Sequence, residues 1–135
     1  MPQAVSAAPT EDYRKADLSF GLMCDWWMER KGIKISDFYN RANITKATFG
    51  NLKNKEGTVP KKRIAFACVV GLRLNVDEAN DLLGRAGLAF SKYFETDKIV
   101  KQCIQMGVYN IDDINWMLDE ENCETLGSGT YEKVS

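Results

Sequence analysis

Residues 35–54 read ISDFYNRANITKATFGNLKN. The apolar residues of this segment recur at helical spacing on both sides of a polar break, which predicts two short helices joined by a tight turn. Ser36 is expected to cap the first helix. Phe38 or Tyr39, together with Ala42, would form the inward face of that helix.

Residue type also marks the turn and the second helix. Asn43 and Ile44 are predicted to make the turn, and Thr45 has the side-chain oxygen that caps a helix N-terminus. Phe49 and Leu52 would then point into the core.

Helical periodicity continues on both sides of this pair, divided by local start and stop signals. Gly32 suits a left-handed stop for a helix that ends at Lys31. Pro60 suits the first position of another helix, where its missing N–H has no partner to lose. Asn75 followed by Glu78 has the pattern of a capping box and opens the next helix.

Two further helices follow, one stopped by Gly107 and one capped by Asn110. No alternating strand pattern of useful length appears, so we predict an all-α fold, a compact helical bundle. The predicted parts are a disordered N-terminal tail at 1–16, a core of about five helices at 17–87, a C-terminal helical extension packed on the core at 88–124, and a flexible tail at 125–135.

Composition limits the class of protein. With 135 residues, 44% hydrophobic and 27% charged, the chain fits one soluble globular domain. No apolar run approaches the roughly 18 residues that a membrane span needs, and residues 1–10 lack the features of a secretory signal. The cysteines at 24, 68, 103 and 123 form no C-x-x-C pair, which favours reduced thiols in a cytoplasmic protein.

Catalysis is the least supported class of function. General acid-base chemistry most often uses histidine, which this chain lacks, and no glycine-rich phosphate loop has the required spacing. Clustered metal ligands at short spacing are also missing from the sequence. We therefore expect no enzyme, no catalytic residue, no metal site and no cofactor.

Positive charge is concentrated between Arg30 and Arg63. Ten Lys and Arg residues in this window face two carboxylates, a net charge of +8, whereas the whole chain nets −1 and the remainder therefore −9. An acidic body with one basic face is typical of a nucleic-acid reader or of a dock for an acidic partner.

The two short helices and their neighbours resemble the phage-repressor (Xre-like) type of helix-turn-helix domain. The residues that carry this resemblance are Ile35-Ser36-Asp37-Phe38-Tyr39, Ile44-Thr45-Lys46-Ala47-Thr48-Phe49, Thr58-Val59-Pro60 and Gly71-Leu72-Arg73-Leu74-Asn75-Val76-Asp77-Glu78. The rest of the chain, through Gly107-Val108-Tyr109-Asn110-Ile111, is similar to a longer bacterial module in which two C-terminal helices are added to such a core. Members of that group are often appended to larger intracellular proteins.

The resemblance implies that the helix after Thr45 enters the major groove of double-stranded DNA. Residues expected at base edges are Lys46, Thr48, Gly50, Asn51 and Lys53. Residues expected at phosphates are Arg41, Thr45, Asn54, Lys55, Lys61, Lys62 and Arg63. The residue types suit this role, because Lys donates to guanine acceptors and Asn pairs bidentately with adenine.

Two features of the basic window have competing interpretations. Lys61, Lys62 and Arg63 occupy the first turn of a helix, where the macrodipole disfavours cations. A phosphate or an acidic partner would compensate for this unfavourable interaction, or the long side chains simply extend into solvent.

Gly50 lies within a helix at a cost of about 0.5–1 kcal/mol relative to Ala. It permits close approach by another molecule's backbone or close packing within the domain.

Trp26 and Trp27 cannot both face the same core, because adjacent helical positions differ by about 100°. They are either covered by the C-terminal helices or form a partner or dimer surface.

Two functions stay open from the sequence. The first is a DNA-binding bacterial or phage transcription regulator, which as a repressor-type reader would act as a homodimer. The second is a helical adaptor that binds a protein through the basic face or through a surface formed by the tryptophan pair with Met23 or Met28.

Overall fold

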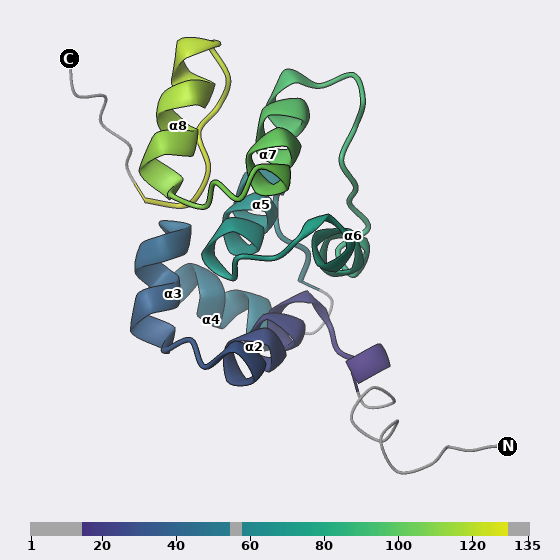
Figure 1. The fold of residues 1–135 in the computed structure, drawn as a ribbon. Helices are drawn as coiled ribbons and strands as arrows, with labels where there is room; N and C mark the ends of the chain where they lie inside the picture. The colour runs from purple at the N-terminus through teal and green to yellow at the C-terminus, as the bar shows by residue number, and fades with distance from the viewer. Residues whose placement is uncertain (1–14, 55–57, 130–135) are drawn as a thin grey trace, which may run out of the picture.

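The computed structural model describes residues 15–54 and 58–129, and within those residues it contains seven α-helices and no strand (Figure 1). The helices are α2 (Phe20–Lys31), α3 (Ile35–Ala42), α4 (Lys46–Asn54), α5 (Lys62–Gly71), α6 (Val76–Gly84), α7 (Glu95–Gln105) and α8 (Ile111–Glu120). The predicted all-α fold is confirmed. None of these helices has the length and the apolar character to cross a membrane.

Helix α5 lies at the centre of the bundle, packed against α3, α6 and α8 (Figure 1). Every residue from Ile64 to Gly71 is buried, and so are Leu72 and Leu74 in the following turn. A helix that is apolar on all sides needs neighbours on all sides. The other elements therefore assemble around α5.

Local capping chemistry sets several of the helix ends at their predicted positions. The Asn75 side chain accepts from the Glu78 N–H while the Glu78 carboxylate accepts from the Asn75 N–H, at 2.9 and 3.0 Å, which completes the capping box. Asn110 accepts from the N–H of Asp113 at 3.0 Å. Gly32 ends α2 in the left-handed conformation, with φ of 68°.

Two helix starts differ from the sequence prediction. Helix α3 begins at Ile35 with Lys34 as its N-cap residue, so Ser36 lies inside the first turn and does not cap it. Helix α5 begins at Lys62, and Pro60 precedes its N-cap residue, Lys61. Neither N-cap side chain accepts a hydrogen bond from its helix. Neither helix start is therefore fixed by a side-chain cap.

Glycines allow two pairs of helices to approach closely. A Cβ atom on Gly21 of α2 would lie 2.6 Å from the backbone oxygen of Leu52 in α4. A Cβ atom on Gly71 of α5 would lie 2.8 Å from the Cβ of Ala42 in α3. These contacts hold α3 and α4 against the bundle through their buried sides.

Residues 125–129, which we call the C-terminal clasp, run back across the bundle. Leu126 is fully buried and exchanges two hydrogen bonds with the Asn115 side chain, at 2.7 and 3.2 Å. The N–H groups of Ser128 and Gly129 donate to the Asn43 carbonyl oxygen at 2.9 and 3.0 Å. The sequence prediction of a flexible tail covered this segment, but here it joins α8 to the turn between α3 and α4.

The buried cysteines are free thiols that pack as small apolar residues. Cys24, Cys68 and Cys103 all belong to the core. Burial raises the pKa of the Cys24 thiol well above its ordinary value, and the adjacent Cys68 adds to the effect. Both thiols thus contribute to packing within the centre of the fold.

Candidate nucleic-acid interface

Helix α4 has one face in the core and one on the surface. Phe49 and Leu52 are buried, as the helical spacing predicts. Phe49 packs edge-on against Phe38, with ring centroids 5.1 Å apart, and it also contacts Tyr39. The backbone of α4 at Leu52 meets α2 at Gly21. These contacts determine which face of α4 points outward.

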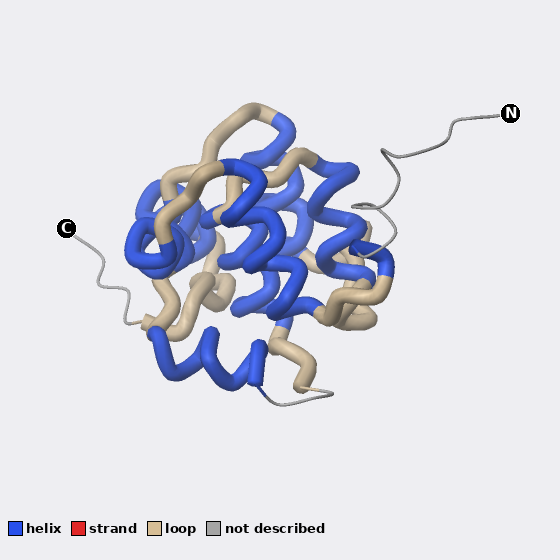
Figure 2. Tube along the Cα trace, turned by 90° about the horizontal axis from the view of Figure 1, so that it is seen from below, coloured by secondary structure: helices blue, strands red, loops and turns tan. Residues whose placement is uncertain are grey.

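The outward face of α4 consists of polar and small side chains. Lys46, Ala47, Asn51 and Asn54 are exposed, and Gly50 between them is half-buried. In Figure 2, α4 lies at the edge of the molecule, just before the grey internal segment, with no other helix beyond it. A partner can therefore approach this face directly.

An open depression of about 700 Å³ runs along the outward side of α4 and α3. It is lined by Ile35, Tyr39, Lys46, Ala47, Phe49, Gly50, Asn51, Lys53 and Asn54. Lys46 stands at the start of α4 and Lys53 near its end, so the depression has a cation at each end of the helix. Such a surface can receive a polyanion and offers amide groups between the charges.

Gly50 meets no described neighbour that would require a glycine at this position. A Cβ atom built on it meets nothing within 4 Å, in contrast to the close contacts at Gly21 and Gly71. Of the two interpretations of this glycine, close packing among the described residues is therefore excluded.

Other predicted contact residues have partners within the chain. The Lys53 ammonium lies 2.9 Å from the Asp25 carboxylate. The Thr45 side chain caps α4 by accepting from the Thr48 N–H at 3.1 Å, as predicted, and it donates to the Thr48 hydroxyl at 2.9 Å. The Thr45 N–H donates to the Ser128 hydroxyl at 2.9 Å. The backbone and hydroxyl donors of Thr45 are thus occupied.

The three cations that precede and open α5 have different surroundings. Lys62 lies 2.6 Å from the Asp97 carboxylate, which is almost fully buried and also accepts from the Ser91 N–H at 2.7 Å. Arg63 donates to the Thr125 carbonyl at 3.1 Å. Lys61 is exposed at the N-cap position. The partners of Lys62 and Arg63 offset part of the macrodipole cost within the chain.

One further predicted phosphate contact lies away from this face, and another lies outside the described residues. Arg41 lines a separate pocket in which no residue of α4 takes part. Lys55 lies outside the described residues. The structure therefore brings together Lys46, Gly50, Asn51, Lys53 and Asn54 along α4, and it does not bring Arg41 to them.

The tryptophan pair packs against the bundle. Trp27 is buried, and its indole Nε1 has no hydrogen-bond partner among the described residues. Trp26 is half-buried and meets Trp27 edge-on at 4.9 Å between ring centroids. Lys15 and Arg30 lie over the Trp26 ring, at 4.8 and 5.1 Å from its centroid. Basic side chains therefore lie over Trp26, and α2 as a whole packs mainly against α4 and α6.

The groove between α7 and α8 has exposed apolar side chains that were not predicted from the sequence, which pointed to the tryptophan pair of α2 as a partner surface. Met106 is 70% exposed and Trp116 48% exposed. Both line a groove of about 430 Å³ that Glu120 and Glu121 border. The helical spacing of Trp116 relative to buried Ile114 and Leu118 was the signal that could have placed it outward.

The described residues contain no group of three or more side chains suited to hold a metal ion. Comparison with protein families, with curated proteins and with solved structures found no match to this chain.

Proposed function

We propose that this protein binds double-stranded DNA with the outward face of α4. The observation that carries the proposal is the open position of Gly50 among exposed Lys46, Asn51 and Asn54. A glycine in a helix interior costs about 0.5–1 kcal/mol relative to Ala, and no described neighbour requires it here. A DNA backbone or base edge that comes close to the helix would require it.

The helices α3 and α4, with the turn at 43–45, support the repressor-type arrangement that the sequence resembles. In this arrangement α4 enters the major groove. Lys46 would donate to guanine and Asn51 to adenine, while Asn54 and Lys61 would contact phosphates. Lys53, held by Asp25, would reach a base edge or phosphate with its half-exposed side chain.

A DNA-binding protein of this type acts as a transcription regulator of a bacterium or phage. Two copies on half-sites one helical turn apart would give it specificity. The basic window supplies the general attraction for DNA, and the acidic remainder orients that attraction toward one face.

Fluorescence anisotropy of a labelled duplex tests the proposal. Lys46→Glu is compared with Lys101→Glu, which makes the same charge change on α7. We expect Lys46→Glu to weaken binding by about tenfold or more at low salt and Lys101→Glu by no more than about twofold. Affinity should also fall with salt along a log–log slope of about −0.9 for each phosphate contact. Equal loss in both variants, or no binding at low salt, would refute the proposal.

A second candidate function is an adaptor that uses the groove between α7 and α8. Exposed Met106 and Trp116 supply apolar anchors, and Glu120 with Glu121 makes the border acidic. The occupant that fits is an amphipathic helix with basic residues beside its apolar face. A Leu/Lys amphipathic peptide should bind and a Leu/Glu peptide should not, and Trp116→Ala should abolish the binding without changing DNA affinity.

A further inference from the structure

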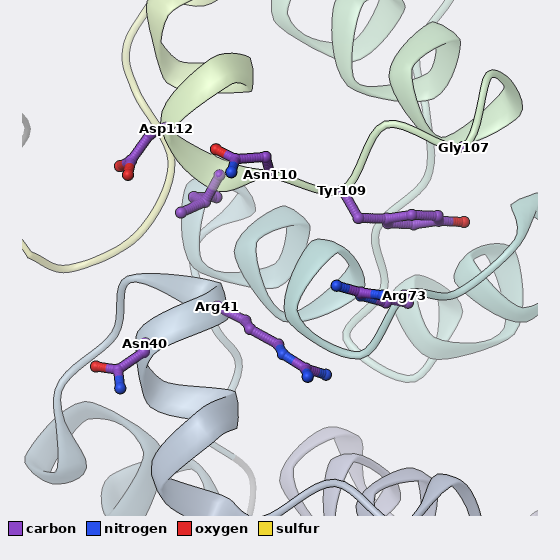
Figure 3. A pocket seen from close by; sticks show the side chains of 8 residues that line it. Asn40, Arg41, Arg73, Gly107, Tyr109, Asn110 and Asp112 are labelled. Carbon is purple, nitrogen blue, oxygen red and sulfur yellow. The ribbon is translucent and has the colours of Figure 1, made fainter.

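A second pocket, distinct from the α4 face, lies where four segments meet (Figure 3). It has a volume of about 370 Å³. Its walls are Asn40 and Arg41 from α3, Arg73 from the turn between α5 and α6, Gly107, Tyr109 and Asn110 from the connection between α7 and α8, and Ile111 and Asp112 at the start of α8. This volume is in the range of small-molecule sites.

Two guanidinium groups dominate the pocket. In Figure 3 the side chains of Arg41 and Arg73 extend from different segments into the same open space. Among the ion pairs of the described residues, neither arginine has a carboxylate partner. Asp112 also lines the pocket, but Figure 3 shows its carboxylate on the far side, turned away from both guanidiniums. Two neighbouring positive charges without a counter-charge favour an anion between them.

The backbone at Arg73 adds an independent observation. Its φ is 53°, in the left-handed region that side chains other than Asn and Gly adopt at a cost. Every other positive-φ residue described is a glycine or one of Asn43 and Asn122. At this one turn the chain has an arginine where a glycine or an asparagine would carry less strain. The turn itself is an ordinary helix stop, in which the N–H groups of Arg73 and Leu74 donate to the Val70 and Val69 carbonyls at 3.0 and 3.1 Å, so the choice of arginine is what the turn leaves unexplained.

The remaining walls are fixed and offer suitable groups. The Tyr109 hydroxyl donates to the Leu74 carbonyl at 2.7 Å, which holds the ring in place. Burial raises the pKa of Tyr109 and Glu78 adds to the shift, whereas Arg73 opposes it. The Asn110 side-chain oxygen is used by the Asp113 N–H, so its NH₂ group is the part left to donate to a ligand.

We propose that this pocket binds the phosphoryl group of a small phosphorylated molecule. Arg41 and Arg73 grip the phosphoryl oxygens with their planar donor pairs, and the Asn110 amide donates a further hydrogen bond. The Tyr109 ring forms the wall against which an organic, preferably planar, part of the molecule rests. The site is independent of the α4 face, because the two share no residue.

Isothermal titration calorimetry at constant ionic strength tests this site with phenyl phosphate and inorganic phosphate. We expect phenyl phosphate to bind more tightly than inorganic phosphate, since only the ester reaches the Tyr109 wall. Arg41→Gln and Arg73→Gly should each weaken phenyl phosphate binding by about tenfold or more, and Lys101→Gln by no more than about twofold.

Arg73→Gly separates loss of binding from loss of folding, because it relieves the left-handed strain while removing the guanidinium. Its thermal midpoint should rise as its affinity falls. Absence of phenyl phosphate binding, or equal affinity in the wild type and both arginine variants, would overturn the proposal. So would a loss of duplex DNA affinity in Arg41→Gln and Arg73→Gly that matches their loss of phenyl phosphate, because the anion would then be a DNA phosphate.

Discussion

At Gly50 a single substitution should change the stability of the fold and the affinity for DNA in opposite directions. Its Cβ position is open, so Gly50→Ala should raise the free energy of unfolding by about 0.5–1 kcal/mol, the ordinary helix preference of Ala over Gly. The added methyl group should at the same time hinder the approach of DNA to α4. We expect a higher urea midpoint together with anisotropy-measured DNA affinity reduced by about fivefold or more.

Gly84 provides the matched control for this prediction. It is also helical and its Cβ position is also open, but it belongs to α6. Gly84→Ala should therefore stabilise the protein without changing DNA affinity. If both alanine variants bind DNA as the wild type does, Gly50 has no role in the interface.

The ion pair of Lys62 with a buried carboxylate was not predicted from the sequence. Its ion pair with Asp97 places a cation against a carboxylate that is only 1% exposed. Lys62→Met should lower the free energy of unfolding by about 2–4 kcal/mol, because it leaves that charge buried and without its cation. Urea denaturation checks this value. Lys62→Met with Asp97→Asn should recover part of the loss, since the amide oxygen can still accept from Ser91.

An outcome in which Lys62→Met keeps full stability but loses DNA binding would contradict this assignment. Lys62 would then act as a phosphate contact, as the sequence predicted. Lys61 offers the comparison, because it is exposed and Lys61→Met should change the free energy of unfolding by no more than about 0.5 kcal/mol.

At the scale of the elements, local signals were enough to predict most helices. The capping box at Asn75 and Glu78, the cap at Asn110 and the left-handed Gly32 depend on neighbours within a few residues, which the sequence contains directly. The outward face of α4 followed in the same way from the spacing of Phe49 and Leu52.

Features that join distant elements were not predictable in this way. The Gly-Ser-Gly sequence and the polar residues around it favour a flexible tail, yet the backbone N–H groups of Ser128 and Gly129 donate to the Asn43 carbonyl. Arg73 takes a left-handed conformation without a glycine to signal it. The ion pair of Lys62 joins α5 to α7 across more than thirty positions of sequence. The clasp and the ion pair depend on tertiary contacts that no local pattern contains, whereas the turn at Arg73 is closed by local hydrogen bonds and lacks only the glycine or asparagine that would signal it.

The contact between α2 and α4 gives a prediction at this scale. Gly21→Ala would place a methyl group against the Leu52 backbone oxygen, where a shift of the helices is the only relief. We expect a loss of about 1–3 kcal/mol in the free energy of unfolding, measured by urea denaturation. Gly84→Ala again serves as the control with open space. A neutral Gly21→Ala would mean that α4 moves freely against α2.

At the scale of the whole molecule, the C-terminal clasp connects the C-terminal helices to the turn between α3 and α4. It bonds Asn115 of α8 on one side and Asn43 after α3 on the other, so the C-terminal helices and the α3–α4 turn share one set of contacts. An assembly joined in this way should unfold as one cooperative unit. Tryptophan fluorescence can follow the unfolding of the N-terminal and the C-terminal helices separately, because Trp26 and Trp27 belong to α2 and Trp116 belongs to α8.

Leu126→Ala tests this coupling. Loss of a fully buried leucine should cost about 2–5 kcal/mol, and the exposed Met106→Ala should cost far less. Urea unfolding is followed by fluorescence in variants that keep either Trp116 alone or the α2 pair alone, each with and without Leu126→Ala. If the clasp couples the two parts, both probes shift to lower urea together and their transitions stay coincident. Separate transitions, with Trp116 changing first, would mean that α7 and α8 form an independent unit that the clasp does not hold to the α3–α4 turn.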